Sequence, residues 1–256
     1  MRGRALLIAA AAALAAGGSG ARGDEGGAAS TAHPVVVELF TAQGCSSCPP
    51  ADRLLAQLGA ASGGRVVPLE FHVDFWNQGG WTDPFSSAEW TRRQEAYAKR
   101  FGATQLYTPQ AIVDGASEMI GSREAEVRAA VAAASAKPAA AIALTLEPSA
   151  KDVRVGAKVD LPEPLRGRKW HLMLAVYETG LVTPVARGEN GGKTLENEYV
   201  VRSLRRAGGV DASGAVEARL PLDKGWNRAR VGVAAFLQDP ATLEIRGAAA
   251  SALPAH

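Results

Sequence analysis

The spacing of apolar residues changes near Lys137 to Ala140, and this change limits the possible folds more than any other feature of the chain. Before it, short β-rich runs alternate with segments of helical period, an order typical of an α/β domain. After it, apolar and polar residues alternate in short runs, a pattern typical of an antiparallel β-sandwich. We therefore predict an α/β domain at residues 33–137 and an all-β, sandwich-like domain at residues 140–252.

The first region has the predicted order strand, helix, strand, helix, strand, strand, helix. Pro49 stands at the start of the first helix, where a missing N–H leaves no hydrogen bond unmade. Ser87 can cap the second helix and Gly102 can end it. The third helix falls within residues 122–137. The predicted strands are residues 33–40, 65–75, 110–114 and 117–121.

The second region contains eight runs that read as strands, with no helical segment between them. Gly, Pro and Asn turns separate these runs, and the sequence GENGG at residues 188–192 is a predicted hairpin turn. The predicted strands are residues 141–147, 152–162, 169–178, 181–187, 198–206, 214–222, 229–239 and 243–251.

The N-terminal residues have the pattern of a secretory signal peptide. Arg2 and Arg4 precede an apolar run over residues 5–16, and small, polar residues follow it. The run is shorter than the roughly 20 residues of a membrane span. We therefore predict a signal peptide over residues 1–22, export to the periplasm or medium, and no integral membrane segment in the mature chain.

The charge of the chain argues against nucleic acid as a partner. A formal net charge of +2 arises from 28 basic and 26 acidic residues, with no basic stripe of the kind that follows a phosphate backbone. No motif in the sequence indicates a bound cofactor.

Both cysteines of the chain lie in the segment FTAQGCSSCPPAD, as Cys45 and Cys48. The pair follows a predicted strand and stands directly before a predicted helix, whose unpaired N–H groups carry partial positive charge. That charge favours a thiolate at Cys45, and the thiolate is the species that attacks disulfides. Cys48, further toward the helix, is then expected to be less accessible than Cys45 and placed to resolve the mixed disulfide.

The cysteine pair has two other possible uses, a metal site and a structural disulfide. A structural zinc site usually needs four Cys or His ligands, and His72 is the one histidine suitably placed to join Cys45 and Cys48. A purely structural disulfide would close a very short loop, and short loops stabilise a fold little. The redox interpretation is therefore favoured.

Several segments together resemble one family: VELFTAQGCSSCPPAD, FHVDFWNQGGWTDPFS, RRQEAYA, YTPQAIVDG and RGENGGKTL. They are similar to the secreted thioredoxin-like proteins grouped as domain of unknown function 1223. The resemblance implies a thioredoxin-like first domain, in which a cis proline at Pro109 faces the dithiol and the backbone of Thr108 pairs with a bound substrate. From the residues alone, this Thr-Pro step could equally be an ordinary trans turn.

Four further residues are candidates for the same site. His72 and Asp74, at the end of the second strand, either act as a pair that adjusts the thiol pKa or leave Asp74 as a loop cap. Trp76 either forms an apolar platform for an extended peptide or closes the core. Glu38 is either a buried acid that relays the proton of the resolving cysteine or a solvent-facing residue.

These observations predict an exported thiol–disulfide oxidoreductase with Cys45 as nucleophile and Cys48 as resolving residue. Its partners would be protein or small-molecule disulfides and dithiols. One alternative is a copper(I) metallochaperone that uses Cys45, Cys48 and His72, since thiolates and imidazole bind soft metals. The other is a non-catalytic binding module with a disulfide that takes no part in exchange.

Overall fold

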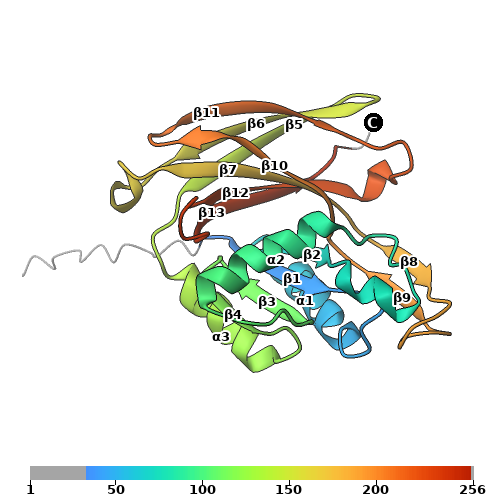
Figure 1. The fold of residues 1–256 in the computed structure, drawn as a ribbon. Coiled ribbons are helices and arrows are strands. Elements are labelled where there is room, and N and C mark those ends of the chain that lie inside the picture. The colour runs from blue at the N-terminus through green and yellow to red at the C-terminus, as the bar shows by residue number, and fades with distance from the viewer. Residues whose placement is uncertain (1–32, 255–256) are drawn as a thin grey trace, which may run out of the picture. The chain divides into compact units, whose positions relative to one another are not determined.

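A mixed sheet of eight strands, in the order β13-β12-β7-β10-β2-β1-β3-β4, runs through the structure (Figure 1). The structure is a computed structural model and describes residues 33–254, so the predicted signal peptide at residues 1–22 lies outside the described range. Two smaller sheets, β11-β6-β5 and β8-β9, complete the described strands.

The elements of the first region follow the predicted order. Ser87 accepts a hydrogen bond from the N–H of Glu89 at the start of the second helix, and Gly102, with φ of 70°, ends it. The third helix begins after Arg123 rather than at Ser122. The elements are β1 (Val35–Thr41), α1 (Pro49–Ala61), β2 (Val66–His72), a 3₁₀ turn (Phe75–Gly79), α2 (Ala88–Phe101), β3 (Gln110–Val113), β4 (Ser117–Ile120) and α3 (Glu124–Ser135).

The second region is almost entirely β, with short 3₁₀ turns between some strands. The eight predicted runs all contain strands, and a further strand, β9, follows the predicted hairpin turn. The strands are β5 (Ala141–Pro148), β6 (Asp152–Asp160), β7 (Trp170–Glu178), β8 (Leu181–Pro184), β9 (Thr194–Asn197), β10 (Val200–Val210), β11 (Gly214–Pro221), β12 (Val231–Gln238) and β13 (Ile245–Ala252).

The prediction of a thioredoxin-like α/β domain followed by a separate all-β domain is wrong, because one sheet passes through both regions. β10 pairs in parallel with β2, with Val200 opposite Glu70. The N–H of Glu70 donates to the carbonyl of Tyr199 over 2.9 Å. β2 thus has β1 on one edge and β10 on the other, and β7, β12 and β13 extend the sheet beyond β10. The apolar pattern of a strand predicts its buried face but not the neighbour its edge will take.

Helices cover both faces of the part of the sheet formed by β1 and β2. Val35, Val37 and Leu39 of β1 share an apolar cluster with α1 and α3. Phe40 of β1 shares a second cluster, on the opposite face, with Trp90 and other residues of α2. This alternation follows from the two-residue period of a strand. It explains why β1 and β2 are buried along their whole length.

The three-stranded sheet β11-β6-β5 packs on the remaining part of the large sheet. Val153, Val155 and Val159 of β6 lie in one apolar cluster with Trp170 of β7 and Val233 of β12. Side chains of the two sheets fill the space between them, as in a β-sandwich. Among the described residues, no helix has the length and apolar character needed to cross a membrane.

Candidate functional site

Cys45 and Cys48 form a disulfide at the start of α1, with their Cα atoms 5.5 Å apart. Cys48 is the residue that precedes the first turn of the helix, and its carbonyl accepts the N–H groups of Ala51 and Asp52. The hydroxyl of Ser47 lies 3.3 Å from Sγ of Cys45. The disulfide therefore sits where helix N–H groups and a hydroxyl can stabilise negative charge on sulfur.

Thr108, Pro109 and Trp76 lie beside the cysteine segment. The Thr108–Pro109 peptide bond is cis. The indole N–H of Trp76 donates to the hydroxyl of Thr108 over 2.7 Å. A Cβ placed on Gly121 would lie 3.2 Å from Cβ of Ala51, in the first turn of α1, and 3.4 Å from Cβ of Pro109. The structure thus brings all three predicted substrate-binding residues to the helix start that carries the disulfide.

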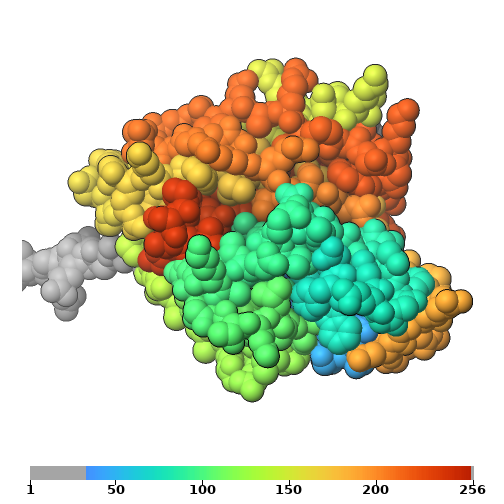
Figure 2. Space-filling view, in the orientation of Figure 1, coloured from blue at the N-terminus to red at the C-terminus, as the bar shows by residue number. Residues whose placement is uncertain are grey.

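Both cysteines are completely buried, with exposed fractions of 0%. The sequence predicts a more accessible Cys45 than Cys48, and the structure makes no such distinction. A segment from the second region is held against the backbone of the cysteine segment. The amide of Asn190, itself buried, donates to the carbonyls of Gln43 and Cys45 over 2.9 Å each. In Figure 2 this part of the chain, in orange, lies against the cyan segment that contains the 3₁₀ turn.

A buried row of ionisable side chains lies at the end of β2. Nδ1 of His72 is 2.7 Å from Oδ2 of Asp83, and its Nε2 is 3.2 Å from Oε1 of Glu70. Asn197 donates to the same Glu70 oxygen over 2.8 Å. The contact between His72 and Glu70 is an ion pair without hydrogen-bond geometry. Oε2 of Glu70 has no hydrogen-bond partner among the described residues.

The charges of this row explain the pKa directions within it. Burial acts to lower the pKa of His72, but Asp83 and Glu70 outweigh it and raise that pKa well above its usual range. Burial acts to raise the pKa of Asp83, but the charge and hydrogen bond of His72 lower it. His72 is therefore held as a cation between two carboxylates.

Asp52 connects this row to the disulfide. It lies one helical turn after Cys48, and its Oδ1 accepts the hydroxyl of Thr41 over 2.7 Å. Burial, followed by the charge of Glu70, raises the pKa of Asp52 well above its usual range. Asp52 is thus a buried carboxyl whose protonated form is favoured by its surroundings, close to the resolving cysteine.

The predicted supporting residue Asp74 and the predicted catalytic residue Glu38 have other partners. Asp74 accepts the hydroxyl of Thr91 over 2.6 Å, so His72 pairs with Asp83 in the loop instead. Glu38 is fully buried, and its Oε1 accepts Nε of Arg93 over 2.6 Å. Tyr97 also donates to Glu38. Glu38 belongs to an ion pair between β1 and α2, and Asp52 is the buried acid on the cysteine helix.

Sequence reasoning missed Asp52, Asp83, Glu189 and Asn190. Asp52, Glu189 and Asn190 stand in segments that carry the family resemblance, as does Asp83 in GGWTDPFS. The sequence therefore did hold an indication of these residues, because they are polar residues within the motifs of the family resemblance. Their roles depend on contacts across long stretches of chain, 147 residues in the case of Asn190 and Gln43.

The residues proposed for copper are not arranged as a ligand set. Cys45 and Cys48 are joined to each other, and carboxylates face both ring nitrogens of His72. No group of three or more His, Cys, Asp or Glu side chains among residues 33–254 is arranged to hold a metal ion.

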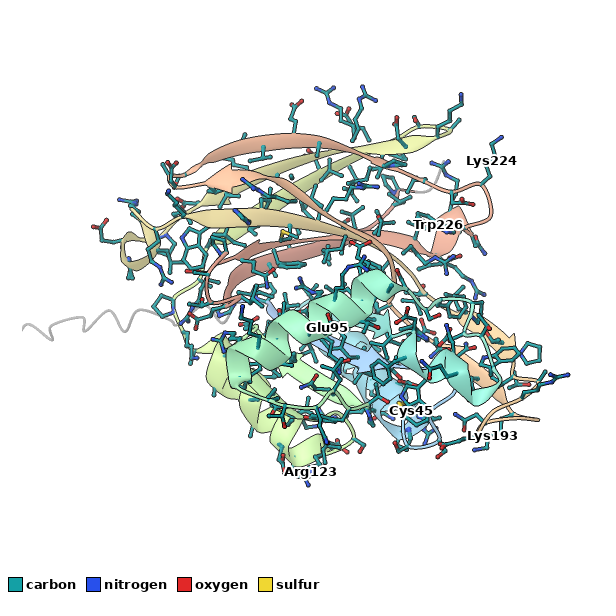
Figure 3. All side chains as sticks on the ribbon, viewed as in Figure 1. Cys45, Glu95, Arg123, Lys193, Lys224 and Trp226 are labelled. Atoms are coloured by element: carbon teal, nitrogen blue, oxygen red, sulfur yellow. A yellow bond between two sulfur atoms is a disulfide. The ribbon has the colours of Figure 1, made fainter. Side chains whose placement is uncertain are left out.

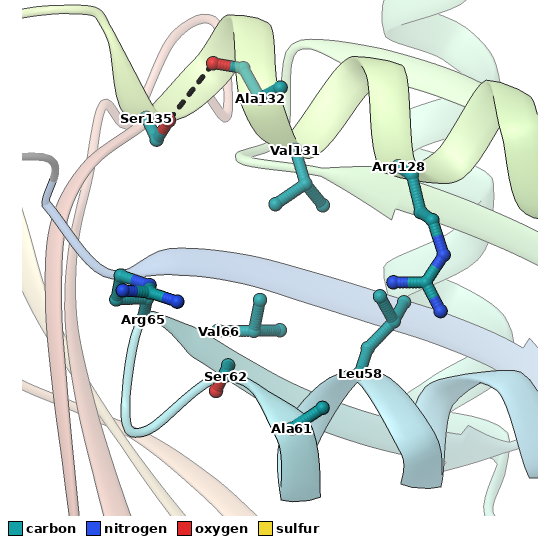
Figure 4. Close-up of a pocket in the computed structure, with 9 residues that line it drawn as sticks. All are labelled: Leu58, Ala61, Ser62, Arg65, Val66, Arg128, Val131, Ala132 and Ser135. Atoms are coloured by element: carbon teal, nitrogen blue, oxygen red, sulfur yellow. Dashed lines mark hydrogen bonds between the residues drawn. The ribbon is translucent and has the colours of Figure 1, made fainter.

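A separate groove of about 460 Å³ lies between α1 and α3 (Figure 4). Leu58, Val66 and Val131 line it, and Arg65 and Arg128 stand at its sides. The groove is at the end of α1 opposite Cys48. It shares none of its lining residues with the disulfide site.

Comparison with known families identifies the chain. Residues 36–238 match the family model described as a protein of unknown function, DUF1223. The chain belongs to the DUF1223 family. This match spans the disulfide, the buried row at His72 and the Asn190 segment, so all of these parts lie within the family region of this DUF1223 protein. The resemblance inferred from the sequence motifs is confirmed at the level of this family.

Two solved structures are similar to this DUF1223 protein. The crystal structure of protein AGR_C_4864 from Agrobacterium tumefaciens is 28% identical, with a TM-score of 0.67, and the match covers 86% of this chain and 93% of that chain. HBP35 of Porphyromonas gingivalis is 17% identical, with a TM-score of 0.63, and the match covers 86% of this chain and 75% of that chain. The second likeness shows the fold alone. No curated protein matches the chain.

Proposed function

We propose that this DUF1223 protein is a thiol–disulfide oxidoreductase that acts outside the cytoplasm. The observation that carries the proposal is the Cys45–Cys48 disulfide at the start of α1, with Thr108 and Pro109 beside it. A four-residue disulfide loop at a helix start is chemically suited to exchange, because the helix stabilises the thiolate that leaves when the bond opens.

The oxidised form can accept two electrons from a client dithiol. A client thiolate attacks Sγ of Cys45, a client–Cys45 bond forms, and the Cys45–Cys48 bond breaks. Cys48 leaves as a thiolate and takes up a proton. The second client thiolate then attacks the client sulfur of the mixed disulfide, and Cys45 leaves as the second thiol. The client gains a disulfide, and the reverse sequence reduces a client disulfide with Cys45 as the attacking group.

The arrangement of neighbouring residues supports these roles. Ser47 places a hydroxyl 3.3 Å from Sγ of Cys45, where it can donate to a thiolate. Asp52 lies one turn beyond Cys48, and because burial favours its protonated form it can donate a proton to the leaving sulfur. The backbone of Thr108 is the surface against which an extended client segment would lie.

Single-cysteine variants test this proposal. Cys48→Ser retains the nucleophile: its Cys45 thiolate attacks a disulfide of a client such as insulin, and one client cysteine leaves as a thiol. Mixed disulfides should therefore accumulate and be seen on non-reducing gels. Cys45→Ser should accumulate none, and the double Ser variant is the matched blank because the chain has no other cysteine. Exchange by the parent protein at the rate of the double variant would refute the proposal.

One observation favours a second candidate, a non-catalytic binding module with a structural disulfide. Both cysteines have exposed fractions of 0%, and an exchanging sulfur must meet its partner in line with the bond it breaks. The two candidates differ in one measurement. With a peptide dithiol as the reductant under native conditions, a structural disulfide stays oxidised, whereas an exchanging one is reduced.

A further inference from the structure

The loop between β8 and β9, residues 185–193, reaches back over the cysteine segment. We call it the cover loop, and its sequence is VARGENGGK. Figure 3 labels Lys193, at its end, and Cys45 in the same part of the protein. The cover loop belongs to the two-stranded sheet β8-β9, which lies outside the large sheet. It is therefore attached to the rest of the fold mainly through its own contacts and those of its hairpin.

The cover loop holds the cysteine segment through two adjacent side chains. The carboxylate of Glu189 accepts the backbone N–H of Ser46 over 3.0 Å and the Ser46 hydroxyl over 2.7 Å. The amide of Asn190 donates to the carbonyls on either side of Gly44. Lys193 in turn donates to Oδ1 of Asn190 over 2.9 Å, which fixes the orientation of that amide.

Glycine at position 188 allows the loop to approach closely. Gly188 has φ of 78°, and a Cβ placed on it would lie 3.3 Å from Cβ of Trp81 and 3.9 Å from Cα of Gly44. Neither the backbone conformation nor the space suits a larger residue. The backbone of the cover loop therefore passes directly over the loop that carries Cys45.

These contacts use the groups that a bound peptide would use. Ser46 offers an N–H to an acceptor, and Gln43 and Cys45 offer carbonyls to a donor. A client strand beside a disulfide makes such main-chain hydrogen bonds. In this structure a carboxylate and an amide from the same chain occupy them.

The cover loop is also weakly held apart from these contacts. Within residues 185–193 only Val185 and Asn190 are buried, and the other residues are exposed. Segments with few buried apolar contacts open at lower free energy than the core. The loop is thus more easily displaced than the strands around it.

We propose that the cover loop is an autoinhibitory segment that occupies the client-binding groups of residues 43–46 and closes off the disulfide until a client segment replaces it. This inference rests on the proposed thiol–disulfide exchange. It accounts for the complete burial of sulfurs that must nevertheless react. It also identifies the client class as polypeptides, because a main-chain segment can replace all of these hydrogen bonds at once.

The rate of reduction by dithiothreitol tests the cover. One dithiothreitol thiolate attacks a cysteine sulfur and breaks the Cys45–Cys48 bond, and its second sulfur closes the cyclic disulfide and releases the second cysteine. Two electrons pass to the protein. The reduced thiols are trapped with iodoacetamide and counted by mass spectrometry. The variants are Glu189→Ala and Asn190→Ala. Glu196→Ala, an exposed carboxylate on the same hairpin with no contact to the cysteine segment, is the control.

We expect Glu189→Ala to raise the second-order rate constant about two- to fivefold, the range for loss of an exposed charged contact. Asn190→Ala should raise it about tenfold or more, because its two hydrogen bonds are buried. Glu196→Ala should leave it unchanged. Far-UV circular dichroism checks that each variant is folded. If both folded variants, Glu189→Ala and Asn190→Ala, are reduced by dithiothreitol at the rate of the parent protein, the proposal that this loop covers the disulfide is wrong.

A client assay separates this inference from the proposed function. Faster reduction of the Glu189→Ala variant with no insulin exchange by any form would support the cover and refute the oxidoreductase. Insulin exchange by the parent, with no change in either rate for the cover-loop variants, would refute the cover and leave the oxidoreductase standing.

Discussion

Thr41 donates its hydroxyl to Oδ1 of Asp52 over 2.7 Å, at the point where β1 ends beside the cysteine helix. The hydrogen bond joins the strand that precedes the cysteines to the helix that follows them. It also acts on the proton of Asp52, because it lowers a pKa that burial and Glu70 raise. The role of Asp52 can therefore be tested by substitution of Asp52 itself and by substitution of its partner Thr41.

Replacement of Asp52 should slow exchange. Asp52→Asn retains the size and polarity of the side chain but cannot supply a proton to Cys48. We expect the rate of insulin exchange at neutral pH to fall about 100-fold, the low end of the contribution of general acid catalysis. Thr41→Val should instead move the corresponding step of the pH–rate profile to higher pH. An unchanged rate and profile in Asp52→Asn would assign Asp52 a structural role only.

Asp114 should make the stability of the protein depend on pH. Burial raises the pKa of Asp114 to about 7, although the N–H of Val36 donates to it over 2.8 Å and acts in the opposite direction. A carboxyl whose pKa is raised on folding contributes stability below its unfolded pKa and loses it as pH rises through the folded value. The free energy of unfolding should therefore fall between about pH 4 and pH 7 by a few kcal/mol.

Asp114→Asn isolates this effect. Asn accepts the same hydrogen bond, and it tolerates the positive φ of 46° at this position. The difference in unfolding free energy between the variant and the parent should grow in favour of the variant from pH 4 to pH 7, as measured by urea unfolding. A difference that does not vary with pH would show that Asp114 is ionised throughout.

The substitution Arg93→Ala should destabilise the fold strongly. Glu38 is fully buried, and without Arg93 its charge has only Tyr97 as a partner. Removal of one member of a buried ion pair costs about 3–5 kcal/mol. Arg128→Ala, which breaks an exposed pair with Glu124, should change stability by less than about 1 kcal/mol. Equal effects of the two substitutions in urea unfolding would contradict this account.

Reduction of the disulfide should alter stability only modestly. The bond closes a loop over a sequence separation of 3, for which loop-closure entropy gives about 2 kcal/mol. In a chain of this size the melting temperature should fall by about 4–8 °C on reduction. A drop of about 20 °C or more in calorimetry would favour the structural role of the disulfide over exchange.

The local elements were predictable from sequence, and their assembly was not. Helix α2 has its Ser87 cap and Gly102 end where local physical chemistry places them. The pairing of β10 with β2 depends on an edge that carries no distinct sequence pattern. β9 was missed because four residues beside a glycine-rich turn are too few to show a period.

In the candidate site, too, the local features were predictable from the sequence and the long-range contacts were not. Cys45, Cys48, Thr108 and Pro109 were identified because their spacing and residue types are local features. Asp83 and Asn190 act on residues 11 and more than 140 positions away, respectively, and no periodicity encodes such contacts. Strand alternation leaves Glu38 either buried or facing solvent, and it does not reveal that Arg93 is the partner of the buried carboxylate.

The parallel contact of β10 with β2 has a consequence for the order of synthesis. Residues 33–137 leave the ribosome before β10 and the cover loop exist, because chains emerge from the N-terminus. The exposed edge of β2 and the uncovered cysteines are then open to solvent together. The burial of Cys45 and Cys48 is therefore a property of the complete fold, reached only when the last strands have paired.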